Sequence, residues 1–87
     1  MNINDLIEKT RNIMKTHYEG MVKVNMGSSD PEIRKEDLCQ QLDALTPEER
    51  IENMRPLYNA LEEKGYAKLI TNDTITFTKE FVGAREQ

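Results

Sequence analysis

The stretch LYNALEEKGYAKLITNDTITFTKEF, residues 57–81, decides the fold of this chain. Its first half carries apolar residues at the three- and four-residue spacing of a helix face as far as Leu61, and Gly65 stands where a helix commonly ends. Its second half alternates threonines with Ile75 and Phe77, which is typical of a strand that buries one face. The stretch therefore predicts the end of a helix followed by a β-hairpin.

The register of this hairpin depends on the length of its turn. A two-residue turn would pair Leu69 with a threonine, whereas a three-residue loop over 71–73 pairs Leu69 with Ile75 and gathers the apolar residues on one face. We therefore expect the three-residue loop, with Asp73 in the left-handed backbone region that aspartate tolerates. This register places Ile70 on the outer face near the tip.

The helix that leads into the hairpin begins at a clear local signal. Thr46 can cap it, Pro47 suits its first position, and Glu49 can close a capping box with Thr46. Because Pro56 inside the helix removes one backbone hydrogen bond, we expect either a kink or two abutting helices. The predicted buried face consists of Ile51, Met54, Tyr58 and Leu61.

The N-terminal part predicts one long helix and a short strand. Apolar residues recur at steps of three and four over residues 4–19, with Asn2 or Asn4 as the cap and Gly20 as the stop. Residues 22–26 alternate between apolar and polar side chains. We expect that this segment could add a third short strand to the hairpin.

A second helix is expected to start between Pro31 and Glu36 and to run to about Asp43. Ser29 and Glu32 have the spacing of a capping box, and proline suits a first turn. Its predicted buried stripe consists of Leu38, Cys39, Leu42 and Leu45. Within that stripe the cysteine is interpreted as a packed small apolar residue.

Length and composition predict a single small domain. Residues 1–83 form the expected domain and residues 84–87 a frayed tail, and a domain of this size buries only about 60–65% of its unfolded surface. The N-terminus lacks the pattern of a secretory signal, and no apolar run reaches the length of a membrane span. The single Cys39 excludes an internal disulfide and favours a cytoplasmic setting.

Few residues support catalysis. His17 and Cys39 are the only histidine and cysteine, they fall on separate predicted helices, and they form no zinc-binding spacing. The carboxylates are plentiful but are spread over helix surfaces, where an acid–base pair does not stand out. We therefore predict that the protein is not an enzyme and uses neither a metal nor a cofactor.

The order of elements resembles that of winged-helix (winged helix-turn-helix) domains: an α+β fold of three helices and a C-terminal β-hairpin. The resemblance covers residues 33–81 and is carried by residues 36–42, 57–67 and 75–80. It implies a DNA-binding transcriptional regulator whose third helix enters the major groove while the wing approaches phosphates. The implied DNA contacts are Asn53, Arg55, Asn59, Lys68, Thr74, Thr76 and Lys79.

The charge distribution opposes this implied function. The net charge is −4, and residues 36–66 hold eight acidic and only three basic side chains. A helical projection places Glu48, Glu49, Glu52 and Glu63 opposite the buried face of the third helix. A surface that reads DNA needs cations to displace the counterions of the duplex, so these carboxylates oppose binding.

A protein-binding module is therefore the favoured hypothesis, with DNA binding as the alternative. The acidic helix face suits a basic protein partner or a homodimer, in a regulator, an adaptor or a phage-type inhibitor. Tyr66 and Ile70 on the hairpin are further candidate contacts. Residues 1–7, MNINDLI, also resemble the opening of an anti-CRISPR inhibitor from Listeria prophages, which would fit the inhibitor version of this hypothesis.

Overall fold

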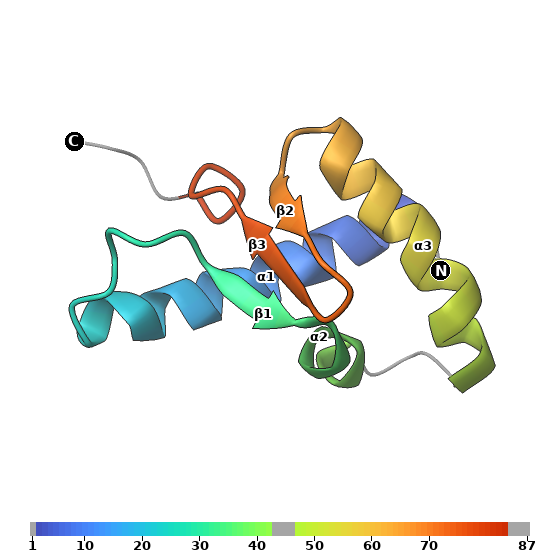
Figure 1. Ribbon diagram of the computed structural model, residues 1–87, viewed down its shortest axis with the longest axis horizontal. Helices are drawn as coiled ribbons and strands as arrows, with labels where there is room; N and C mark the ends of the chain where they lie inside the picture. The colour runs from blue at the N-terminus through green and yellow to red at the C-terminus, as the bar shows by residue number, and fades with distance from the viewer. Residues whose placement is uncertain (1, 43–46, 84–87) are drawn as a thin grey trace.

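The computed structural model describes residues 2–42 and 47–83, and for residues 47–53 it describes the backbone alone. Its elements, in chain order, are α1 (Ile3–Lys23), β1 (Glu32–Arg34), α2 (Lys35–Gln41), α3 (Pro47–Glu63), β2 (Ala67–Ile70) and β3 (Thr74–Phe77). The strands form an antiparallel sheet in the order β1-β3-β2, and α1 passes behind it in Figure 1. This α+β fold with a C-terminal hairpin confirms the predicted class and is consistent with a winged-helix topology.

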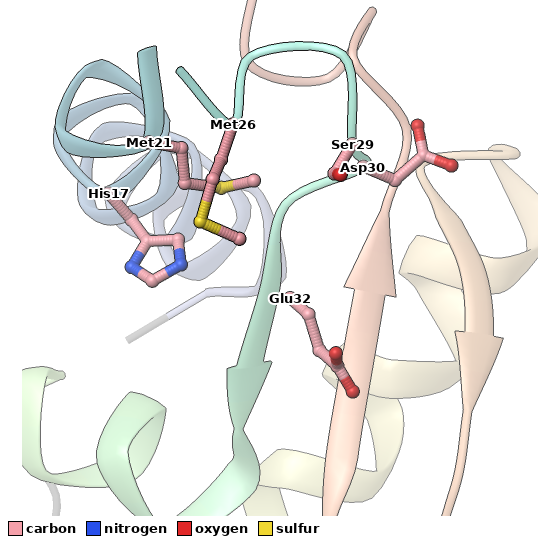
Figure 2. A pocket seen from close by; sticks show the side chains of 6 residues that line it. All are labelled: His17, Met21, Met26, Ser29, Asp30 and Glu32. Carbon is pink, nitrogen blue, oxygen red and sulfur yellow. The ribbon is translucent and has the colours of Figure 1, made fainter. Parts of the chain in front are cut away.

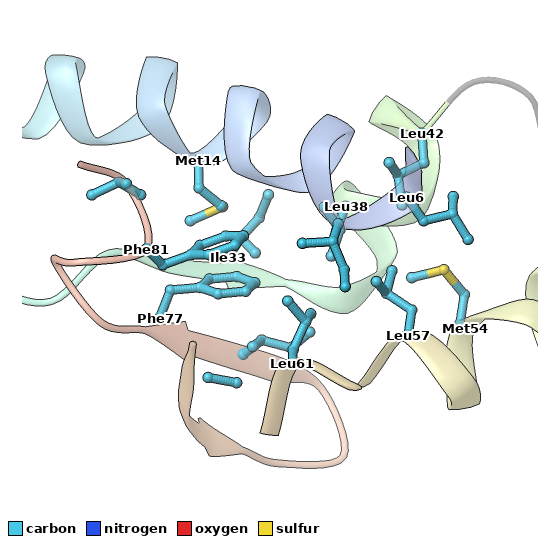
Figure 3. Close-up of a cluster of buried hydrophobic side chains, with 14 residues drawn as sticks. Leu6, Met14, Ile33, Leu38, Leu42, Met54, Leu57, Leu61, Phe77 and Phe81 are labelled. Carbon is cyan, nitrogen blue, oxygen red and sulfur yellow. The ribbon is translucent and has the colours of Figure 1, made fainter. Parts of the chain in front are cut away.

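The core fills the space between α1, α3 and the inner face of the sheet (Figure 3). Within it, the rings of Phe77 and Phe81 stack at a centroid distance of 4.9 Å, and both side chains are fully buried. The other buried apolar residues are Leu6, Ile7, Met14, Ile33, Leu38, Leu42, Met54, Leu57, Leu61, Ala67, Ile75 and Val82. Residues just beyond the hairpin are thus part of the core.

The first helix is longer than predicted, because it passes Gly20 and ends three residues later, at Lys23. Asn2 caps its start, where the side-chain oxygen accepts the Asp5 backbone N–H at 2.9 Å. At the other end Asn25 adopts a positive φ of 63°, and the Met26 N–H donates to the Met21 carbonyl at 2.8 Å. This is a Schellman motif, in which a left-handed residue satisfies the last helix carbonyls. Asn25, not Gly20, stops the helix.

The Schellman motif predicts a stability effect at Asn25. Replacing it with alanine should lower the free energy of unfolding by about 1 kcal/mol, because a Cβ without a local hydrogen-bonding group disfavours the left-handed region. Urea unfolding of Asn25→Ala would measure this loss. Asn25→Gly, which removes the Cβ, serves as the control and should be as stable as the natural chain. An alanine variant no less stable than the glycine variant would contradict the role assigned to Asn25.

The third strand lies at Glu32–Arg34, and the prediction of a strand at 22–26 is wrong. Ile33 pairs with Ile75 of β3 and is buried, whereas residues 22–26 belong to the end of α1 and its turn. The predicted start of the second helix, between Pro31 and Glu36, is confirmed, but the predicted cap at Ser29 and first turn at Pro31 are wrong. Pairing with β3 holds residues 32–34 extended, so α2 begins only at Lys35 and Ser29 caps no helix. Beyond Leu42, the end of the predicted second helix lies outside the described residues.

The hairpin tip has the register of a two-residue turn. Leu69 pairs with Thr76, and the Thr71 N–H donates to the Thr74 carbonyl at 2.9 Å. Asp73 does not have the positive φ that the three-residue loop required. The predicted three-residue loop over 71–73 is therefore wrong.

A bulge restores the apolar pairing farther from the tip. The register shifts between Ala67 and Leu69, which brings Ala67 opposite Phe77 as predicted. Ile70 now faces the core side, where it pairs with Ile75 and is half-buried, while Leu69 is exposed. The prediction that Ile70 lies on the outer face is therefore wrong, because the extra residue reverses the two faces between tip and base.

The third helix is continuous through Pro56, so the alternative of two abutting helices is wrong. The proline itself is exposed. Met54 and Leu61 are buried and Tyr58 is half-buried, as predicted. Gly65 has a φ of 72° and ends the helix in a second Schellman motif, also as predicted. The cap at Thr46 and the side chains of Glu49 and Ile51 lie outside the described part of the chain.

No described helix is long and apolar enough to cross a membrane.

Candidate protein-binding surface

The outward face of α3 carries mixed charges over its described half. Arg55, Asn59, Glu62 and Glu63 are exposed, on the side away from buried residues such as Leu57. The predicted contacts Arg55, Asn59 and Glu63 are therefore accessible. The side chains of Glu48, Glu49, Glu52 and Asn53, also predicted as contacts, lie outside the described residues.

The two lysines of the predicted wing contact the loop before β1. The Lys68 ammonium lies 2.8 Å from the Asp30 carboxylate, and the Lys79 ammonium donates to the Ser28 carbonyl at 2.7 Å. The loop is held near the hairpin by the backbone of Phe77, whose N–H donates to the Pro31 carbonyl at 2.8 Å. Both cations therefore have a partner within the molecule.

The remaining predicted hairpin contacts are only partly accessible. Thr74 and Thr76 lie on the central strand β3 and are half-buried, and the Thr74 hydroxyl lies 2.8 Å from that of Thr71. Tyr66 is half-buried and packs against the Phe81 ring, with centroids 5.0 Å apart. Tyr66 therefore supports the core, and the exposed apolar residue of the hairpin is Leu69, at 59% exposure.

A surface that the sequence did not reveal lies at the end of α1. Within this fully described helix, no residue after Met14 is buried. The half-buried Met21 and the exposed Val22, Val24 and Met26 form what we call the α1-end patch, and the last three are 51%, 64% and 51% exposed. The alternation over 22–26 pointed to a strand with one buried face. Recognising Asn25 as the helix stop would have revealed an exposed apolar turn instead.

An open hollow of about 430 Å³ lies between this helix end and the chain segment that leads into β1 (Figure 2). His17, Met21 and Met26 line one side, and Ser29, Asp30 and Glu32 line the other. Met21 and Met26 are neighbours because the Schellman motif brings its first and last residues together, often with a hydrophobic contact. The methionine side chains point toward one another on one side of the hollow, whereas the carboxylates of Asp30 and Glu32 point away from them.

The cysteine and the histidine have different surroundings. Cys39 is half-buried and packs against the core as a small apolar side chain, as predicted, beside the hydroxyl of Tyr58. Burial, followed by the nearby Cys39, raises the pKa of Tyr58 well above its usual value. His17 is exposed and lines the hollow. Among the described residues, no three His, Cys, Asp or Glu side chains gather in a way that could hold a metal ion.

No protein-family model, no curated protein and no solved structure matches this chain.

Proposed function

We propose that this protein is a small winged-helix-type protein-binding module that recognises a basic protein partner. It would act as a regulator, an adaptor or a phage-type inhibitor in the cytoplasm. The observation that carries the proposal is that both wing lysines, Lys68 and Lys79, are engaged by the loop over residues 28–30. Each ammonium would have to release its partner before it could contact a phosphate.

The charges of α3 support the same proposal. Of its exposed side chains from residue 54 onward, Arg55 is the single cation, and Glu62 and Glu63 are two adjacent anions. The sequence adds three more carboxylates in the first turns of this helix. Docking this face on DNA would place carboxylates near phosphates, whereas a basic protein surface would complement them.

The DNA-binding alternative has one specific observation in its favour. Arg55 and Asn59 are exposed one helical turn apart on the outward face of α3, where a winged helix would read bases. Lys68 and Lys79 could add phosphate contacts if they released Asp30 and the Ser28 carbonyl.

A duplex titration separates the two functions. We expect no binding of a fluorescent mixed-sequence duplex tighter than about 10⁻⁴ M at about 50 mM salt, the weak end of non-specific DNA binding. Fluorescence anisotropy would measure it. As a positive control, Glu62→Lys with Glu63→Lys should raise the affinity, because it replaces two anions with two cations. Binding by the natural chain that weakens with salt with a logarithmic slope of several units would contradict the proposal.

A further inference from the structure

We infer that Asp30 and Glu32 are specificity-determining residues, whose carboxylates keep phosphates away from the wing lysines, Lys68 and Lys79. This inference rests on the proposed function and deepens it, because it names what lets the protein accept a basic partner and reject nucleic acid. Specificity of this kind needs a repulsive element against the wrong partner as well as an attractive one for the right partner.

The wing lysines are the part of the hairpin that would attract phosphates. Their ammonium groups reach the same short loop, where Lys68 contacts Asp30 and Lys79 donates to the Ser28 carbonyl, two residues away. Two cations gathered at one loop raise the local concentration of anions, and contacts between lysines and phosphates supply most of non-specific binding to nucleic acid. The hairpin therefore needs a counter-charge if the protein is to avoid phosphates.

The segment that carries the two carboxylates is fixed on both sides. Before it, the Tyr18 hydroxyl of α1 donates to the Gly27 carbonyl. After it, the Phe77 N–H donates to the Pro31 carbonyl at 2.8 Å, and Glu32 pairs with Thr76 in the sheet. The backbone of residues 27–32 is thus held against α1 and β3, so its carboxylates stay beside the hairpin.

The carboxylates point toward the hairpin, away from Met21 and Met26 (Figure 2). That of Asp30 lies 2.8 Å from the Lys68 ammonium. That of Glu32 belongs to an exposed side chain directly opposite Thr76, and side chains of opposite residues in an antiparallel pair project from the same face of the sheet. One anion therefore accompanies Lys68 and a second accompanies the central strand.

The position of these charges matters more than the strength of the ion pair. The Lys68 side chain is 63% exposed, and an exposed ion pair contributes little, so Lys68 could release Asp30 easily. The carboxylate would nevertheless remain beside it, because the backbone holds the loop in place. Charges act over about 10 Å or more at low salt, so a phosphate on Lys68 would be repelled by Asp30 and by Glu32.

NMR titration with a short mixed-sequence DNA duplex tests this inference. The full chain is compared with Asp30→Asn with Glu32→Gln, which removes both charges and keeps the side-chain sizes. At about 1 mM duplex and about 20 mM salt, we expect the variant to show duplex-induced shifts of the Lys68 and Lys79 amides, with a Kd about tenfold or more below that of the natural chain, the value of one added phosphate contact at low salt. The shifts should fade at about 200 mM salt.

A matched control separates the position of the carboxylates from net charge. Glu19→Gln with Asp37→Asn removes the same two charges at exposed positions on α1 and α2, and should bind the duplex no better than the natural chain. Equal gains in both variants would overturn the inference. Shifts at Lys68 and Lys79 that are as strong in the natural chain as in the Asp30 and Glu32 variant would also overturn it.

The location of the shifts distinguishes this inference from the proposed function. If removing the two carboxylates produced no shift at Lys68 and Lys79, the inference would fail and the proposed function would stand. If the natural chain bound the duplex with salt-dependent shifts confined to Arg55 and Asn59 on α3, the proposed function would fail. The role of Asp30 and Glu32 at the hairpin would then stand.

Discussion

Replacing Phe81 with alanine is expected to destabilise the protein by about 3–5 kcal/mol, the usual cost of removing a buried aromatic ring. Phe81 is fully buried although it lies four residues beyond the last strand. Its ring stacks on Phe77, packs against Tyr66 and lies 4.7 Å from the Arg11 guanidinium carbon. Because the whole stability of a small domain is about 5–15 kcal/mol, this variant should be largely unfolded or close to it.

Urea unfolding followed by circular dichroism would measure the effect. Phe81→Leu keeps most of the buried volume and should be clearly more stable than Phe81→Ala. Leu69→Ala, at a 59% exposed position on the hairpin, is the surface control and should change stability by no more than about 0.5 kcal/mol. If Phe81→Ala were as stable as Leu69→Ala, the segment after β3 would not belong to the core.

Reversing two charges on α3, by Glu62→Lys with Glu63→Lys, is expected to weaken partner binding about 100-fold or more. Both side chains are exposed, so the change should leave the fold intact. Placing like charges opposite each other in an interface costs several kcal/mol. Affinity capture from a lysate of the source organism, with mass spectrometry to quantify the partner, would measure the loss. Glu49→Lys with Glu52→Lys tests the same face at the positions that the sequence predicted.

A matched control excludes a mere effect of net charge. Glu36→Lys with Glu80→Lys makes the same change of four charge units, at exposed positions outside α3. Its one described ion pair, between Arg34 and Glu36 at 3.6 Å, is exposed on both sides and contributes little stability. The control should still capture the partner. Equal loss in both variants, or capture retained by both α3 variants, would remove the acidic face of α3 from the proposed function.

The sequence predicted the register at the base of the hairpin but not at its tip. Pairing apolar residues correctly placed Ala67 opposite Phe77, because burial of one face constrains the strand register. The same reasoning predicted a three-residue loop, since it assumed that one register held along the whole hairpin. The bulge between Ala67 and Leu69 allows a two-residue turn at the tip and apolar pairing at the base. As a result, Leu69 is exposed and Ile70 is half-buried.

The candidate surface was predicted less completely than the fold. The sequence correctly marked Arg55, Asn59 and Glu63 as outward-facing, because helix periodicity alone determines which side of α3 is apolar. It did not predict that the lysines of the hairpin would contact the loop over 28–30, since those partners lie 38 and 51 residues away along the chain. It also missed the hollow, which two separate segments enclose.

Local patterns in the sequence by themselves determined the three helices, the Gly65 stop and the C-terminal hairpin, because spacing and backbone preference act over a few residues. Tertiary structure decided where the third strand lies, since Ile33 becomes a strand residue only by pairing with Ile75. It also decided which charges remain available at the surface and which apolar residues stay uncovered. Those outcomes depend on contacts between segments that are distant in the sequence, and local sequence patterns do not predict such contacts.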